Sequence, residues 1–214
     1  MKALILGLSL LSLSGVPATA QQISFDRSWT EQRFSLFSRN RYGLDGAALN
    51  VASDGSVSLV WNALPMTSWQ SRAASWTWSV DRSVPATDLT RKGGDDRNLS
   101  LYFVFLPEQT ALATQGKPIR TLLNNDAVRV LTYVWGGVHK RGDVLASPYL
   151  GARGKTLVLR PSGTGVAMER IDLSRDYQRA FGSPATSLVG LAVSADSDDT
   201  DSAILARIGN LLIE

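Results

Sequence analysis

The sequence predicts an all-β fold, a β-sandwich or jelly roll with one short helix near residues 174–181. Short apolar segments alternate with small polar residues, as in strands that bury one face. Turn-forming residues separate these segments at short intervals, since the 214 residues include 18 glycines and 8 prolines. Strands do not alternate with long helical patterns along the chain, which excludes an α/β fold.

The first two strands of clear pattern surround a tight turn. Residues 49–51 and 57–61 alternate apolar and small polar side chains, and Ser53, Asp54, Gly55 and Ser56 lie between them. Asp-Gly favours the positive φ angles of a short hairpin turn. The segment therefore predicts a β-hairpin.

Later strands carry most of the large apolar residues. Trp76 and Trp78 lie on one face of their strand and are expected in the core. Further strands are predicted at 99–105, 130–135, 157–159, 188–193 and 204–213. The segment 174–182 predicts the helix, with Ser174 as its N-cap and Gly182 at its end.

The N-terminus has the pattern of a secretory signal peptide. Met1 and Lys2 precede an apolar run over residues 3–13, and Ala18-Thr19-Ala20 offers small residues at a cleavage site. The run is shorter than the ~20 residues that a membrane anchor needs. We expect a signal peptide over residues 1–20 and one β-sandwich domain over residues 21–214. No segment of the mature chain is expected to span a membrane, so the protein is expected in the periplasm or outside the cell.

Composition excludes several kinds of site. The chain has no cysteine, which excludes disulfides, a cysteine nucleophile and thiolate metal sites. Its single histidine excludes two-histidine zinc motifs. The net charge is +3, and the basic residues are scattered among acidic ones rather than clustered. The sequence therefore predicts no nucleic-acid partner.

Two acidic loops are candidate sites. The first contains Asp95 and Asp96, and the second runs from Asp196 to Asp201. The candidate metal ligands are Asp196, Asp198, Asp199 and Thr200. Their alternate spacing lets oxygen atoms converge on one ion, which favours a structural Ca²⁺. The alternative is a solvated acidic loop in which aspartates form turns. No other cofactor is indicated.

Aromatic residues near strand ends are candidate ligand contacts. Tyr133, Trp135 and Tyr149 would stack on sugar rings if their side chains are exposed, and Asp95 and Asp96 would bind the hydroxyls. The alternative for such aromatics is the core of the sandwich. We predict no catalytic residue, because the sequence shows no recognisable pairing of a nucleophile with a base.

Several segments, taken in order, are similar to a known family. They are Trp76–Val80, Lys92–Asp96, Leu101–Phe105, Leu131–Gly136, Ser147–Tyr149, Arg170–Tyr177 and Asp196–Thr200. This order resembles a bacterial family of exported proteins, domain-of-unknown-function family 3047. Asp199 stands where the family's loop usually has asparagine. The resemblance implies a β-sandwich and export, and it supplies no activity and no catalytic residue.

The functional hypothesis is an exported, non-catalytic binding or accessory module for a glycan or another cell-envelope component. The first alternative is an envelope glycan hydrolase or lyase that uses acidic residues. The second is a protein-interaction subunit. An exposed aromatic platform favours the binding module, and carboxyl groups that converge in a cleft favour the enzyme.

Overall fold

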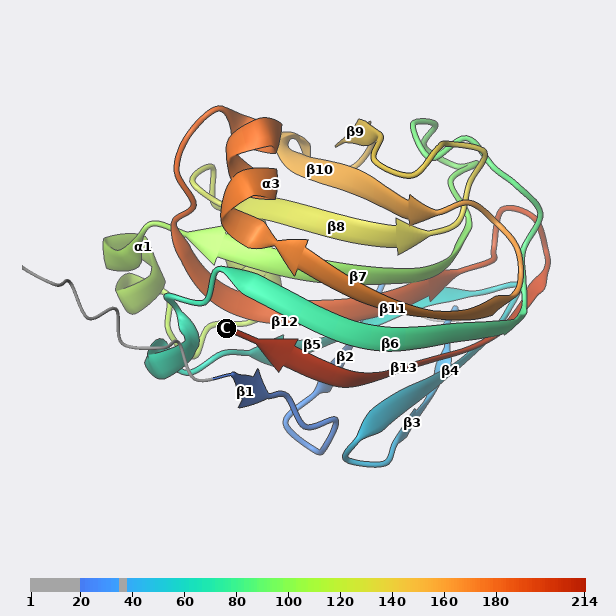
Figure 1. Cartoon of the computed structure of the whole chain (residues 1–214), viewed down its shortest axis with the longest axis horizontal. Helices are drawn as coiled ribbons and strands as arrows, with labels where there is room; N and C mark the ends of the chain where they lie inside the picture. The colour runs from blue at the N-terminus through green and yellow to red at the C-terminus, as the bar shows by residue number, and fades with distance from the viewer. Residues whose placement is uncertain (1–19, 35–37) are drawn as a thin grey trace, which may run out of the picture.

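The computed structural model describes residues 20–34 and 38–214, and two β-sheets packed face to face form the sandwich that the sequence predicts (Figure 1). The six-stranded sheet has the order β11-β6-β13-β4-β3, and β1 also pairs with β13. Its strands are β1 (Gln21–Gln22), β3 (Arg41–Leu44), β4 (Ala48–Asp54), β6 (Ala73–Arg82), β11 (Gly165–Asp172) and β13 (Ala203–Ile213).

The second sheet has seven strands in the order β2-β5-β12-β7-β8-β10-β9. Its strands are β2 (Thr30–Arg33), β5 (Val57–Ala63), β7 (Arg97–Leu106), β8 (Arg129–Trp135), β9 (Val144–Ser147), β10 (Gly151–Arg160) and β12 (Ser187–Asp196). The β8 and β10 strands run parallel, whereas their neighbours in the sheet pair antiparallel.

Aromatic rings from both sheets fill the core. Trp76 and Trp78 on β6 are each 1% exposed, and their ring centroids lie 5.4 Å apart in an edge-on arrangement. Trp76 also meets Phe103 and Tyr133 of the opposite sheet, at centroid distances of 6.3 and 5.9 Å. The alternation in β6 therefore predicted its buried face correctly.

The turn at Ser53–Ser56 does not close a hairpin, so that prediction is wrong. The strand before it, β4, pairs with β3 and β13, whereas the strand after it, β5, pairs with β2 and β12. The turn thus carries the chain from one sheet to the other. Gly55 has the positive φ of 51° that the Asp-Gly pair indicated. The local sequence pattern predicts that the chain reverses direction, but contacts with residues distant in sequence determine which strand each one pairs with.

The predicted helix is α3 (Leu173–Phe181), and Gly182 ends it in the left-handed region with φ of 73°. Its N-cap is Asp172 and not Ser174, because the Asp172 side chain accepts a hydrogen bond from the backbone N–H of Arg175 at 2.9 Å. The helix closes one end of the sandwich, where Tyr177 packs edge-on against Phe105.

Two more short helices lie against the outer face of the seven-stranded sheet. They are α1 (Glu108–Ala113) and α2 (Ile119–Leu123), and a single 3₁₀ turn, η1 (Met66–Ser68), precedes β6. The helices bury an apolar cluster that contains Trp61 of β5. Trp61 lies directly over Gly190, where an added Cβ would come within 1.8 Å of the ring. Only glycine leaves room for this ring on the sheet.

The N-terminal prediction lies almost wholly outside the described residues. Residues 1–19 are not described, so the signal peptide and the export that depends on it stay predictions. Among residues 20–34 and 38–214, no helix is long and apolar enough to cross a membrane.

Candidate functional site

A cleft of about 450 Å³ lies on the outer face of the seven-stranded sheet, and α2 contributes to its lining. The floor of the cleft consists of residues that lie side by side on four adjacent strands, β12, β7, β8 and β10. These residues are Ala192, Tyr102, Thr132 and Thr156, in that order. Loops form its rim, and they contribute Lys92, Asp95, Pro148, Tyr149, Asp198 and Asp199. Apolar side chains line the rest, among them Leu59, Leu89, Ile119, Leu123, Val130 and Leu150. The cleft therefore offers both apolar surface and hydrogen-bonding groups.

Arg97 organises the polar side of the cleft. Its Nη1 atom donates to Asp95 Oδ2 at 2.8 Å and to Asp196 Oδ2 at 3.0 Å, so one guanidinium holds a carboxyl group from each acidic loop. Its Nη2 atom donates to the Tyr102 hydroxyl at 3.1 Å, and this hydroxyl lies 2.9 Å from Ser194 Oγ. Only 13% of the Arg97 side chain is exposed. The charged groups are therefore held in place before any ligand arrives.

Arg97, Tyr102 and Ser194 were not among the residues predicted from the sequence. The signal was present, because Tyr102 and Ser194 are polar residues within the otherwise apolar runs 101–106 and 188–195. Two such residues on one face of adjacent strands indicate a polar floor, but only if the strand pairing is known.

Tyr149 stands at the rim with 53% of its surface exposed. Its hydroxyl donates to Asp95 Oδ1 at 2.8 Å, and the ammonium of Lys92 lies 5.6 Å from the centre of its ring. Burial of the hydroxyl end and its bond to Asp95 raise the pKa of Tyr149, so the hydroxyl remains a donor. Both carboxyl oxygens of Asp95 therefore have partners, one in Tyr149 and one in Arg97.

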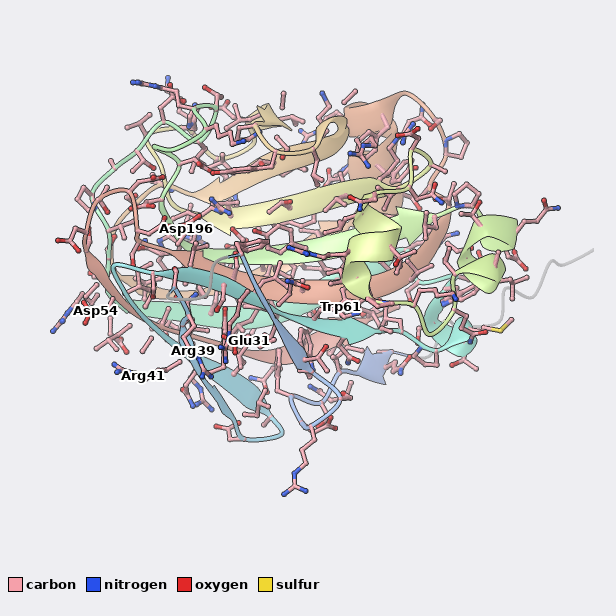
Figure 2. The ribbon with its side chains drawn as sticks, turned by 180° about the vertical axis from the view of Figure 1, so that it is seen from behind. Glu31, Arg39, Arg41, Asp54, Trp61 and Asp196 are labelled. Carbon is pink, nitrogen blue, oxygen red and sulfur yellow. The ribbon has the colours of Figure 1, made fainter. Side chains whose placement is uncertain are left out.

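Asp196 differs from Asp95 because one of its oxygens is unpaired. Asp196 is 5% exposed, and its Oδ1 atom has no hydrogen-bond partner among the described residues. Burial raises the pKa of Asp196 to about 8, with Asp198 and Asp96 adding to this rise and Arg97 opposing it. Figure 2, which views the molecule from behind, labels Asp196 and Trp61 on this side of the molecule. Asp196 thus presents an unused carboxyl oxygen at the cleft.

The other acidic residues meet beside the cleft. Asp96 is fully buried, and its Oδ2 atom accepts hydrogen bonds from the backbone N–H of Thr200 at 2.8 Å and from the Thr200 hydroxyl. One carboxyl oxygen from each of Asp96, Asp198 and Asp199 lies within 4.8 Å of the corresponding oxygens of the other two. Burial, followed by the charges of Asp96 and Asp198, raises the pKa of Asp199. These three carboxyl groups could hold a metal ion, and Thr200 fixes one of them.

The predicted aromatic platform is wrong for two of its three residues. Tyr133 is 0% exposed and Trp135 is 4% exposed, because both side chains point into the sandwich. Tyr133 pairs with Leu101 in the register of β7 and β8, and both belong to the core. The alternate residues of β8, among them Val130 and Thr132, face the cleft instead. Tyr149 and Asp95 line the cleft, whereas Asp96 binds the loop between β12 and β13.

Comparisons with solved structures find distant similarity. One similar structure is the xyloglucanase domain of NopAA, a type three effector from Sinorhizobium fredii, in complex with cellobiose. It is 11% identical in sequence, with a TM-score of 0.46, and the match covers 90% of this chain and 97% of that one. The family 11 xylanase from Neocallimastix patriciarum is 10% identical with a TM-score of 0.45, over 94% of this chain and 98% of that one. No curated protein matches the chain.

A comparison with protein-family models gives a match over nearly the whole described chain. The model is described as a protein of unknown function (DUF3047), and it matches residues 22–212. This range includes both sheets, the cleft and both acidic loops. The similarity inferred from the ordered sequence segments is thereby confirmed, and the chain belongs to the DUF3047 family.

Proposed function

We propose that the cleft binds a saccharide of the cell envelope without cleaving it. The observation that carries this proposal is the exposed ring of Tyr149 above a floor of fixed polar groups. Sugar rings present apolar C–H faces that pack on aromatic rings, while their hydroxyls need hydrogen-bond partners. Thr132, Thr156 and Ser194 supply hydroxyls on the floor, and Asp196 supplies an unpaired oxygen.

The export predicted from the N-terminus supports the choice of ligand. An exported protein meets the glycans of the envelope before other saccharides. Among the described residues that line the cleft, the basic ones are Lys92 and Arg97, and two carboxyl groups already balance the charge of Arg97. The cleft also holds Asp198 and Asp199. The acidic excess favours a neutral or amino sugar over a uronic acid.

Hydrolysis is the second candidate, because carboxyl groups of the two acidic loops do converge on Arg97. Glycosidases use such a pair, one carboxyl group as acid and the other as base or nucleophile. Asp95 is poorly suited to either role, since Tyr149 and Arg97 already occupy both of its oxygens. Asp196 alone has a free oxygen among the pair, so binding is the better-supported function.

A pull-down on purified peptidoglycan, a glycan array and product analysis of every hit test the two functions together. We expect retention of at least one saccharide with no new reducing ends after prolonged incubation. Release of reducing ends that Asp196→Asn abolishes would establish the hydrolase instead. If no saccharide is retained, a protein-interaction role becomes the leading hypothesis.

A further inference from the structure

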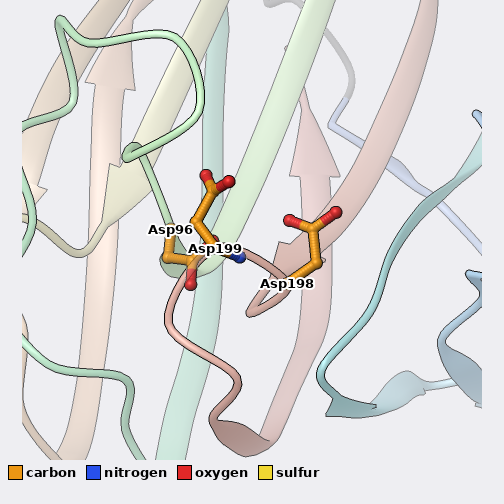
Figure 3. Close-up of side chains that lie close together, drawn as sticks. All are labelled: Asp96, Asp198 and Asp199. Carbon is orange, nitrogen blue, oxygen red and sulfur yellow. The ribbon is translucent and has the colours of Figure 1, made fainter.

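Two loops that are about a hundred residues apart in sequence bring three carboxyl groups together. Asp96 lies just before β7, and Asp198 and Asp199 lie in the loop between β12 and β13 (Figure 3). One oxygen of each lies within 4.8 Å of the others. Among the described residues, none of the three forms an ion pair with lysine or arginine. Their mutual repulsion is therefore not balanced by a basic side chain.

The cluster is fixed at its buried end. Asp96 is 0% exposed and accepts hydrogen bonds from the backbone N–H groups of Asp199 and Thr200 and from the Thr200 hydroxyl. The bond from Asp199 to Oδ1 is long, at 3.3 Å, so this oxygen can accept another partner. Asp198 and Asp199 are exposed, which leaves room for water molecules to complete a coordination shell.

A second, independent observation concerns Asp196. This residue ends β12 two positions before Asp198, and both residues line the cleft. Its Oδ2 atom binds Arg97, whereas its buried Oδ1 atom has no donor among the described residues. The charges of Asp198 and Asp96 both act on Asp196, and neither carboxylate can donate a hydrogen bond to this oxygen. A buried carboxyl oxygen that has no donor needs a cation or a proton beside it.

We propose that Asp96, Asp198 and Asp199 bind a calcium ion at the edge of the cleft, next to the unpaired oxygen of Asp196. Ca²⁺ takes six to eight oxygen ligands at 2.3–2.6 Å, and oxygens on opposite sides of one ion are then about 5 Å apart. The spread of at most 4.8 Å in the cluster fits this requirement. Only oxygen atoms are offered, which suits a hard cation and not zinc or copper.

The ion would tie the loop before β7 to the loop between β12 and β13. A Cβ added at Gly93 would lie 3.9 Å from Asp199 Oδ1, so the two loops already lie side by side. Both loops contribute to the rim of the cleft through Asp95 and Asp198. The ion therefore stabilises the folded protein and fixes the rim, whether or not a saccharide binds there.

The test uses calcium alone, with no saccharide. Calorimetric titration of the chelator-treated protein should give a saturable heat with a stoichiometry of one. The melting temperature should rise by about 5–11 °C at a calcium concentration a hundredfold above Kd. The double variant Asp198→Asn, Asp199→Asn keeps the shape of the exposed side chains and should lose both responses.

A matched control removes the same charge from outside the cluster. The double variant Asp54→Asn, Asp201→Asn should keep the calcium response, and asparagine tolerates the positive φ of 47° at residue 201. Circular dichroism confirms that both variants are folded. The proposal is overturned if wild type gives no heat, if both double variants lose the response equally, or if magnesium at the same ionic strength produces the same shift.

Discussion

Arg97 and Asp196 are 99 residues apart in the sequence, and they form an ion pair of 3.0 Å between Nη1 and Oδ2 at the floor of the cleft. Asp95 shares the same nitrogen at 2.8 Å. All three side chains are at most 13% exposed, so this pairing is shielded from solvent. The Arg97 guanidinium therefore supplies the counter-charge for the buried carboxyl groups of Asp95 and Asp196.

Replacing Arg97 should destabilise the protein strongly. Arg97→Met leaves Asp95 and Asp196 buried without a counter-charge, and removal of one partner from such a pair costs about 3–5 kcal/mol. Urea unfolding measures the loss of free energy. The exposed pair of Arg207 with Asp45 is the control, since Arg207→Met should cost less than about 1 kcal/mol. Equal losses for the two variants would show that the Arg97 pair is not buried as described.

The contact between Gly190 and Trp61 should tolerate no added methyl group. The Cβ of Gly190→Ala would overlap the Trp61 ring, and overpacking of this kind costs ~1–3 kcal/mol or more. Gly43→Ala is the control, because its nearest contact is an ordinary 3.6 Å to Asn50. Thermal melting should separate the two. A melting temperature of Gly190→Ala equal to that of Gly43→Ala would mean that Trp61 does not lie over the strand.

Alkaline pH should destabilise the protein in part through Tyr133. The Tyr133 hydroxyl is buried and donates to Asp176 Oδ2 at 2.9 Å, and burial followed by the Asp176 charge raises the pKa of Tyr133 well above its ordinary value. Above about pH 10 the unfolded chain releases this proton while the folded chain retains it. The unfolded state then binds fewer protons, so the free energy of unfolding falls as pH rises, and the contribution is fully present below pH ~10.

The Tyr133→Phe variant tests this relationship. Its free energy of unfolding should fall less steeply above about pH 10 than that of wild type. Tyr42 and Tyr149 also have raised pKa values, so the slope should shrink without vanishing. A variant with the full wild-type slope would rule out Tyr133 as a contributor.

The sequence predicted the elements better than their partners. Alternation located eight strands and placed Trp76 and Trp78 in the core, because one buried face imposes a period of two. It did not locate the short strands β1, β2, β3 and β9, nor β11. The same alternation put Tyr133 and Trp135 on one face of β8 but could not say which face is inside. That choice depends on Trp76 and Trp78 of the opposing sheet, which pack against Tyr133 and Trp135 and are distant from them in sequence.

The candidate site was predictable only in part, for the same reason. The density of aspartates marked both acidic loops, and Tyr149 was identified as a strand-end aromatic residue. The meeting of the two acidic loops on Arg97 depends on the pairing of β7 with β12, which no local pattern encodes. The Ser53–Ser56 turn shows the same limit, since its sequence predicts a reversal and not the sheet that follows.

Calorimetric titration of the best saccharide from the array against Tyr149 variants tests the central claim most directly. Wild type should bind with a Kd between micromolar and millimolar, about 4–8 kcal/mol. Tyr149→Ala should weaken binding tenfold or more because the stacking ring is gone, and Tyr149→Phe should weaken it less. Val166→Ala, at an exposed position on β11 away from the cleft, should bind as wild type does. Wild-type affinity in Tyr149→Ala would contradict the proposal that this cleft is the saccharide site.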